Sequence, residues 1–224
     1  MTRPRLEVPD HLNRNSPRVR SIGAEETGGV LLRVACEALG LEDLSSCDVL
    51  DVGCGVRFVQ TILNRRLSIR SYTGIDVDGP VIRFLKTEVR DPRFTFARWE
   101  VHNPLYNVNG PRMTRDTPLP VGGDFDVIWL FSVFTHLAPD DADAMFAILR
   151  RHVRREGRLL FSAFLDPSVA TFEEKAPATP GLRSTYNEVF MRSLCERNGW
   201  VVLALHDKDP ETKFIQHHFV CGPV

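Results

Sequence analysis

The stretch CDVLDVGCGVRF, residues 47–58, leads from a short apolar segment into an acidic residue and two glycines. Asp51 ends the apolar segment, and Gly53 and Gly55 follow it one residue apart. Glycine tolerates positive φ angles and lets a ligand lie directly against the backbone. In open α/β sheets the ligand lies beyond the carboxyl ends of the strands. The stretch therefore predicts a buried strand, a ligand-binding turn and a following helix.

Arg57 stands at the next place where a nucleotide-binding loop often carries a third glycine. With an arginine there, the backbone cannot pass as close to a ligand. The separate motif G-x-G-x-x-G cradles a pyrophosphate, and its absence favours a ligand without one.

Asp76 ends the next predicted strand, SYTGID. A carboxylate at that place accepts hydrogen bonds from both hydroxyls of a ribose in many nucleotide-binding sheets. The alternative is that Asp76 caps the following helix, but Asp78 is better placed for that. The two strand ends together predict a nucleoside site.

Predicted strands and helices alternate along the rest of the chain. Short apolar or alternating runs predict strands, and apolar residues at helical spacing predict helices, the first of which ends at Gly40. The expected strands are 47–52, 71–76, 93–101, 125–134, 157–165, 200–207 and 213–222, and the expected helices are 24–39, 58–68, 80–90, 141–155 and 184–199.

This order predicts an α/β fold with a Rossmann-like, doubly wound, seven-stranded sheet. The last two strands have no helix between them, so they must pair as a C-terminal antiparallel hairpin. Dinucleotide-dependent dehydrogenases normally continue with helical crossovers instead.

The composition is that of an ordinary globular protein. With 224 residues, the chain fits a single domain over residues 25–224. The 28 basic and 29 acidic side chains nearly balance, which gives no electrostatic reason to expect nucleic acid as a partner. The 5 cysteines form no CxxC pair and predict free, buried thiols in a reducing compartment.

Residues 1–24 are rich in proline, arginine and asparagine, which predicts a flexible N-terminal arm. It is either a disordered tail or a lid that closes over a site with its arginines. The segment has no apolar core of a secretory signal, and no run approaches the roughly 20 apolar residues of a membrane helix. We therefore expect a cytoplasmic protein without membrane insertion; the oligomeric state stays open.

Four motifs resemble, in order, those of class I S-adenosylmethionine (SAM)-dependent methyltransferases. They are VLDVGCG, YTGIDVD, FARWEV and FDVIWLFSVFTHL, and the terminal hairpin resembles the same family. The resemblance covers residues 47–137, and the strand–helix pattern extends it to the C-terminus. It implies that the chain is a methyltransferase with SAM as its cofactor.

The resemblance also implies which residues hold SAM. Asp51, Gly53 and Gly55 would lie against its methionine part, with Arg57 pointing either at the methionine carboxylate or into solvent. Asp76 would hold the ribose, and the remaining contacts would come from Val77 on the adenine, Trp99 beside the ring, Glu100 in place of the usual aspartate, and the backbone near Phe131 and Ser132.

His136 follows the strand 125–134 at the carboxyl edge of the predicted sheet. A hydroxyl acceptor must lose a proton, and histidine has the side-chain pKa that best suits a general base. The alternative is that His136 only orients its loop. Nitrogen-methylating relatives often carry an Asn/Asp-Pro-Pro-aromatic run at this place, which is absent here.

The stretch VHNPLYN and the proline-rich connection after it resemble methyltransferases of sugars and sugar-containing natural products, with mannosides among the acceptors considered. Such a saccharide or other small-molecule acceptor would lie between the connections 103–123 and 166–186. Tyr106, Asn107 and Tyr186 are the candidate substrate-binding residues. Acceptors of another kind (a carboxylate, a lipid hydroxyl or a nitrogen) and a non-catalytic SAM-binding module, which Arg57 favours, are the alternatives.

Some sugar O-methyltransferases also use a divalent cation, so Mg²⁺ is a further candidate. Six residues could contribute ligands, but none shows a metal-specific spacing, and the ligand set stays unknown. They are Asp140, Asp141, Asp143, Asp166, His217 and His218.

Overall fold

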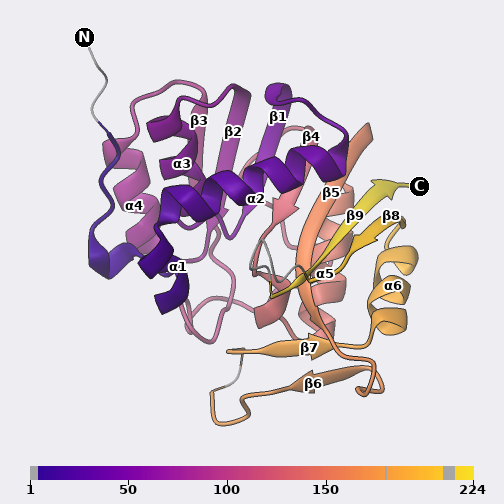
Figure 1. Ribbon diagram of the computed structural model, residues 1–224. Helices are drawn as coiled ribbons and strands as arrows, with labels where there is room; N and C mark the ends of the chain where they lie inside the picture. Colours follow the sequence, from indigo (N-terminus) through magenta and orange to yellow (C-terminus); the bar gives the residue numbers. More distant parts are fainter. Residues whose placement is uncertain (1–4, 180, 209–214) are drawn as a thin grey trace.

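The computed structural model describes residues 5–179, 181–208 and 215–224. Seven strands form the main sheet in the order β3-β2-β1-β4-β5-β9-β8 (Figure 1). The first five run parallel, whereas β9 is antiparallel to both β5 and β8. The doubly wound sheet and its C-terminal hairpin are thereby confirmed. The bounds are β1 Leu44–Val52, β2 Ile69–Asp76, β3 Phe94–Arg98, β4 Phe125–Leu130, β5 Val153–Leu165, β8 Trp200–His206 and β9 His217–Pro223.

Helices cover both faces of this sheet (Figure 1). Alternate strand residues face opposite sides, so Val49 packs with α2, α3 and α4 while Leu50 packs with α5 and α6. Two hydrophobic cores result, one on each face, and they hold the carboxyl ends of the strands together at one edge. The helix bounds are α2 Ala24–Leu39, α3 Arg57–Arg65, α4 Gly79–Glu88, α5 Pro139–Arg150 and α6 Glu188–Arg197.

Two helix boundaries differ from the prediction by four or more residues, and the other differences are smaller. The expected helix 141–155 ends at Arg150, because Val153 already pairs with Phe125 in the parallel ladder of β4 and β5. The basic residues after it belong to the strand, where Arg154 forms ion pairs with aspartates of β1 and β4. The expected helix 184–199 begins at Glu188, since the side chain of Asn187 accepts a hydrogen bond from the amide of Val189 and so caps it.

The connection 166–186 was expected to be a loop, but it contains an additional hairpin. Strands β6 (Phe172–Glu174) and β7 (Ser184–Tyr186) pair antiparallel, and β7 pairs parallel with the last residues of β5, Phe164 and Leu165. Figure 1 shows the hairpin at the bottom of the molecule, where the parallel strands end. The sheet thus continues past its own carboxyl edge.

The N-terminal segment is packed against the domain over its described part. Leu6 and Leu12 are buried, with 7% and 5% of their surface exposed, and the amide of Leu6 donates to Asn64 Oδ1 over 2.8 Å. A 3-10 helix, η1 (Asp10–Leu12), and a short helix, α1 (Pro17–Ile22), follow. Residues 1–4 lie outside the described part, and movement of the segment as a lid stays a prediction.

The described part of the chain contains no helix that is long and apolar enough to span a membrane. The cysteines are all free thiols, and four of them are buried: Cys47, Cys54, Cys195 and Cys221.

Candidate active site

The turn after β1 has the backbone geometry that its glycines predict. Gly53 and Gly55 have φ angles of 71° and 50°, and the amide of Gly53 donates to the carbonyl of Ile75 over 2.8 Å. A Cβ on Gly53 would lie 2.6 Å from Cγ2 of Val133, whereas a Cβ on Gly55 would meet nothing within 4 Å. The turn is therefore pressed against the segment that follows β4 and open above Gly55.

Asp76, at the end of β2, binds the turn directly. Its Oδ2 accepts a hydrogen bond of 2.9 Å from the amide of Gly55, and its Oδ1 accepts one of 2.9 Å from the amide of Asp78. Burial raises the pKa of the Asp76 carboxyl, and these amides oppose the shift. Each carboxylate oxygen has capacity for a second donor, so Asp76 can still accept hydrogen bonds from a ligand.

Asp78 has a different task from the predicted helix cap. It precedes α4, but its side chain makes no capping hydrogen bond. Instead its Oδ2 pairs with Nε of Arg14 at 2.9 Å. An arginine of the N-terminal segment thus pairs with Asp78, which is two positions after Asp76 in the chain.

Asp51 lies beneath the turn. Its side chain is 1% exposed and accepts a hydrogen bond from the hydroxyl of Tyr72. Burial raises the pKa of Asp51 to about 7, with the hydrogen bond from Tyr72 acting against the shift. In this structure Asp51 therefore supports the turn from below and does not line an open surface.

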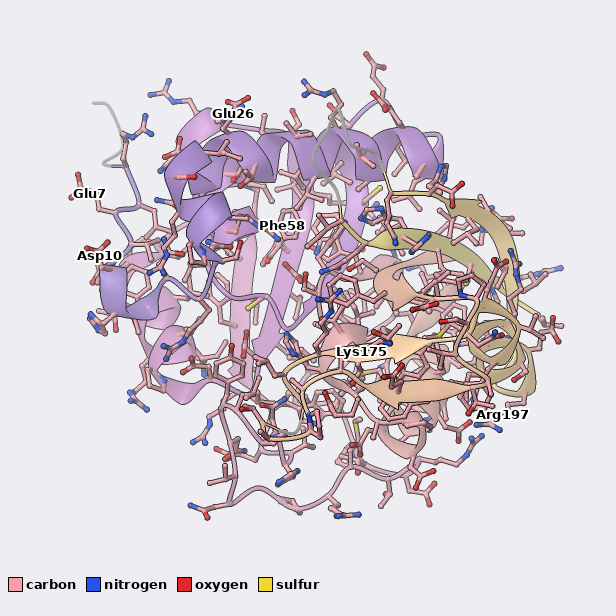
Figure 2. The ribbon with its side chains drawn as sticks, turned by 60° about the horizontal axis from the view of Figure 1, so that its bottom comes forward. Glu7, Asp10, Glu26, Phe58, Lys175 and Arg197 are labelled. Carbon is pink, nitrogen blue, oxygen red and sulfur yellow. The ribbon has the colours of Figure 1, made fainter. Side chains whose placement is uncertain are left out.

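Arg57 is the first residue of α3 and lies beside the turn. Its Cγ is 3.3 Å from the position of a Cβ on Gly28 of α2, and its guanidinium carbon is 5.6 Å from the ring centre of Phe58 (labelled in Figure 2). Burial lowers the pKa of Arg57, an effect that the nearby Asp51 opposes. Within the described residues, no carboxylate forms an ion pair with this guanidinium. It is a half-buried cation with Asp51 nearby but with no ion-pair partner in the described part of the chain.

The residues expected to contact the adenine are partly or fully engaged in contacts within the protein. Val77 is half-buried against the core. Trp99 is 4% exposed, and its indole Nε1 donates to the carbonyl of Pro118 over 3.0 Å. Glu100 lies on the surface and pairs with Nη1 of Arg98 at 2.9 Å. The carboxylate of Glu100 is therefore engaged with its neighbour in this structure.

Phe131 and Ser132 follow β4 on the other side of the turn. The Phe131 side chain is 8% exposed and packs on Phe58 with ring centres 4.9 Å apart. Ser132 has a φ angle of 61°, a conformation that non-glycine residues rarely adopt and that clusters at functional sites.

Ser132 belongs to a polar cluster that sequence reasoning missed. Its amide donates to Oγ of Ser162 over 2.8 Å. The Oγ of Ser162 donates to Oε1 of Gln216 over 2.6 Å, and Nε2 of Gln216 donates to Oγ of Ser132 over 3.0 Å. Since the cluster joins three distant segments, no local pattern in one sequence could reveal it.

His136 lies in the 3-10 helix η2 (Phe134–His136), one turn from the contact between Val133 and Gly53. Its amide donates to the carbonyl of Val133 over 2.9 Å. Its Nδ1 is 2.7 Å from the carbonyl oxygen of Gly181. A carbonyl can only accept, so Nδ1 carries the proton in the neutral ring, and Nε2 keeps a free lone pair.

Both long connections meet at this histidine. Gly181 has a φ angle of 75°, and a Cβ on it would lie 2.5 Å from Cγ of Pro104. The carboxylate of Glu174 accepts hydrogen bonds from the amides of Gly181 (2.9 Å) and Arg183 (3.3 Å). The segment that holds His136 is thus itself held by an acidic side chain of β6.

The three predicted acceptor-binding residues differ in availability. Tyr106 is 41% exposed, with the guanidinium carbon of Arg14 5.7 Å from its ring centre. Asn107 is buried and donates to the carbonyl of Val101 over 2.8 Å. Tyr186 is fully buried, and its hydroxyl donates to the carbonyl of Leu137 over 2.5 Å. In this structure Asn107 and Tyr186 are buried and hydrogen-bonded within the protein, whereas Tyr106 is exposed; binding of an acceptor by these residues stays a prediction.

The described residues contain no group of three or more His, Cys, Asp or Glu side chains arranged to hold a metal ion. His218 is buried, which lowers its pKa to about 4, and His217 is half-buried with a lowered pKa. Asp143 is engaged by Arg115 and Arg197. The expected candidate Mg²⁺ finds no support in this arrangement.

The turn, Asp76 and Arg57 fit one kind of ligand. The open space above Gly55 admits a bulky group against the backbone, and Asp76 offers acceptor capacity of the kind that ribose hydroxyls use. The unpaired cation of Arg57 suits a carboxylate. A nucleoside with an amino-acid tail, such as SAM, has all three features, and the order of the strands is that of the class I methyltransferase fold.

Comparisons with known proteins agree. Residues 50–159 match the family model described as a methyltransferase domain. Together with the fold, this match confirms the resemblance of the sequence to class I SAM-dependent methyltransferases.

Solved structures of the same fold include several methyltransferases. The glycopeptide N-methyltransferase MtfA, complexed with sinefungin, has a TM-score of 0.63 and 14% identity over 90% of this chain and 94% of its own. The magnesium protoporphyrin IX methyltransferase ChlM from Synechocystis PCC 6803, with bound S-adenosylhomocysteine (SAH), has a TM-score of 0.59 and 17% identity over 95% and 90%. CalO1, a methyltransferase in calicheamicin biosynthesis, has a TM-score of 0.61 and 14% identity over 92% and 55%.

Proposed function

We propose that this protein transfers a methyl group from SAM to a hydroxyl of a saccharide or a sugar-containing small molecule, with Nε2 of His136 as the general base. The hydrogen bond from His136 Nδ1 to the carbonyl of Gly181 carries the proposal. In the neutral ring this bond leaves the free lone pair on Nε2, at the end of β4, one turn from the glycine turn.

The cofactor supplies, when bound, a methyl group made electrophilic by its sulfonium. The chain's own residues do the rest. Asp76 holds the ribose hydroxyls, the backbone at Gly53 and Gly55 carries the amino-acid part, and Arg57 pairs with its carboxylate. Nε2 of His136 would take the proton from the acceptor hydroxyl that receives the methyl group, while the sulfonium would leave as the neutral thioether of SAH.

The loops around His136 support a polar acceptor. Pro104 and Gly181 bring the two long connections together beside the histidine, and the exposed Tyr106 can hydrogen-bond a hydroxyl through its own. The segment FSVFTHL lacks the Asn/Asp-Pro-Pro-aromatic run of many nitrogen methylators. Two proteins of the same fold, a glycopeptide N-methyltransferase and a methyltransferase in calicheamicin biosynthesis, also favour natural-product acceptors, though the first does not favour a hydroxyl over a nitrogen.

Substitution of His136 tests the assignment. We expect His136→Ala and His136→Asn to lose about 10²–10⁴-fold in kcat, the contribution of a general base. The asparagine amide can still donate to Gly181, so this variant removes the base while it keeps the loop contact. Transfer of labelled methyl from SAM to a panel of saccharides, with and without magnesium, measures the rate.

Calorimetric titration with SAM and SAH is the matched control, because both variants should bind these nucleosides like the wild type. Equal rates in His136→Asn and the wild type would remove the base assignment. Methyl transfer to carboxylates or amines but to no saccharide would overturn the acceptor class. Absence of SAM binding in the wild type would leave only a non-catalytic role.

A further inference from the structure

A cavity of about 520 Å³ lies beyond the end of β5, between that strand, the β6–β7 hairpin and the start of β9. It contains none of the residues expected to hold the cofactor. Its lining combines apolar and basic side chains: Phe164, Leu165, Asp166, Lys175, Arg183, Thr185, Lys208 and Ile215. Figure 2 shows the hairpin, with Lys175 labelled, across the side of the molecule that forms the bottom of Figure 1.

Among the described residues that line the cavity, cations outnumber acids: Lys175, Arg183 and Lys208 against Asp166. Lys175 is balanced by Glu173, with which it pairs, and by Asp166 at 3.8 Å. Among the described residues, no carboxylate lies within 4.0 Å of Arg183 or Lys208, although Lys208 is near enough to Asp166 to help lower the pKa of that carboxyl. The guanidinium carbon of Arg183 lies 4.7 Å from the ring centre of Phe164, so the N–H donors of Arg183 lie above an aromatic ring.

A buried hydroxyl beside these cations also lacks a partner. Thr185 lines the cavity and is 4% exposed, and its Oγ1 forms no hydrogen bond within the described part of the chain. Buried polar groups are nearly always paired, so an unpaired donor next to two cations points to a missing acceptor. An oxyanion is the acceptor that would satisfy all three.

The apolar side of the cavity adds a second requirement. Phe164 and Leu165 come from the end of β5, and Ile215, which is 57% exposed, lies across from them. A hydrophobic side chain so exposed beside a cavity gains from an apolar ligand group that covers it. The cavity therefore suits an anion that carries a hydrophobic portion.

The same segments reach the proposed catalytic histidine. Arg183 and Thr185 follow Gly181, whose carbonyl binds His136. Gln216, the neighbour of Ile215, is hydrogen-bonded to Ser132 at the end of β4. A molecule anchored in the cavity can thus extend towards His136 along the walls that these segments form.

We propose that this cavity anchors the methyl acceptor through an oxyanion, a carboxylate or a phosphate, that is attached to an apolar group. The link to methyl transfer rests on the proposed function; the binding of the anion does not. The acceptor is accordingly an acidic amphiphile and not a neutral sugar.

Binding of simple probes tests the cavity without any turnover. Hexyl phosphate, hexanoate, inorganic phosphate and hexyl glucoside are titrated calorimetrically into the full-length protein. We expect hexyl phosphate or hexanoate to bind at least about tenfold more tightly than inorganic phosphate or the uncharged glucoside. The stronger of the two hexyl anions identifies the oxyanion as phosphate or carboxylate.

Variants locate the binding. Arg183→Met and Lys208→Met should each weaken hexyl-anion binding by about tenfold. Ile215→Ser should weaken the hexyl anions but not inorganic phosphate. The controls Arg90→Met and Lys86→Met remove the same charges from the exposed surface around α4 and should change nothing. Circular dichroism checks that every variant is folded.

Two results would overturn the proposal: equal affinity for charged and uncharged hexyl probes, or equal losses in the cavity variants and the α4 controls. A labelled-methyl assay with a hexyl glucuronide and a hexyl glucoside then tests the link to catalysis, with the glucuronide expected as the better acceptor. Anion binding without methyl transfer to either compound would refute the proposed function and leave the anion site standing.

Discussion

Nδ1 of His136 lies 2.7 Å from the carbonyl oxygen of Gly181, which is 45 residues further along the chain. The partner that sets the tautomer of the histidine is therefore a backbone group of the β6–β7 hairpin. That backbone is in turn held by the carboxylate of Glu174, through the amides of Gly181 and Arg183. The arrangement of the hairpin and the state of the imidazole are thus coupled.

Glu174 is accordingly a positioning residue. We expect Glu174→Ala to lower kcat by about tenfold, since a displaced base loses alignment, while SAM affinity stays unchanged. The ¹⁵N shifts of the His136 ring provide an independent readout: protonation mainly at Nδ1 in the wild type and a mixture of tautomers in the variant. Glu174→Gln, which keeps an acceptor oxygen, should restore most of both properties. Unchanged ring shifts in Glu174→Ala would contradict the coupling.

Gly53 and Gly55 allow a matched comparison. Both have positive φ angles, so an alanine at either position costs about 1 kcal/mol of backbone strain. Only at Gly53 does the new methyl group also meet Val133, at 2.6 Å, which adds about 1–3 kcal/mol of overpacking. Urea unfolding should therefore show a larger loss of stability for Gly53→Ala than for Gly55→Ala.

Shortening Val133 separates strain from the clash. The double variant Gly53→Ala/Val133→Ala should recover part of the loss, whereas Val133→Ala should not improve Gly55→Ala. Equal losses of stability at both glycines would mean that Val133 moves aside without lowering the free energy of unfolding. SAM titration of Gly55→Ala tests the open space above that residue, because the methyl group should weaken binding even in a well-folded protein.

Arg57 should contribute to cofactor affinity through the methionine carboxylate. We expect Arg57→Met to weaken SAM binding by about tenfold, the effect of one charge-assisted hydrogen bond. Binding of 5′-methylthioadenosine, which lacks the amino-acid part, should be the same in the variant and the wild type. The control Arg33→Met removes an exposed arginine of α2 and should leave both affinities unaltered. A parallel loss for methylthioadenosine would show that Arg57 acts on the turn and not on the carboxylate.

Asp51 should make stability depend on pH. Its pKa of about 7 in the folded protein exceeds the ordinary value of 3.8, so the folded state binds the extra proton between these two pH values. The stabilisation from this group is complete below pH 3.8 and is lost as the pH rises through about 7. We expect Asp51→Asn to remove this loss. The free energy of unfolding of the variant minus that of the wild type should therefore increase as pH rises.

Urea unfolding across about pH 4 to 8 measures the difference between the two proteins. The control Asp10→Asn, at an exposed position, should run parallel to the wild type over the whole range. A constant difference between Asp51→Asn and the wild type would show that the carboxyl is not protonated in the folded state.

The sequence predicted the cofactor half of the fold well because its signals are local. The glycines after β1, the acid at the end of β2 and the glycine that ends α2 each act within a few residues, and the structure has each where the pattern predicts it. The terminal hairpin followed from the missing helix between the last two strands.

The sequence did not predict those features that depend on contacts between distant segments. The basic run after α5 reads as a helix end, but pairing of Val153 with Phe125 makes it a strand. In the sequence Tyr186 resembles a ligand-binding tyrosine, but in the structure its hydroxyl donates to the carbonyl of Leu137. The left-handed backbone of Ser132 and the β6–β7 hairpin leave no local pattern, because partners far along the chain stabilise both.

The β6–β7 hairpin is attached to the parallel sheet through just two residue pairs, Phe164 with Thr185 and Leu165 with Tyr186. Insertions or replacements in this hairpin that keep Glu174 and Gly181 in place would leave both His136 and the turn at Gly53 and Gly55 unchanged. Variation in the rest of the hairpin would therefore change the surface beside His136 without changing the turn.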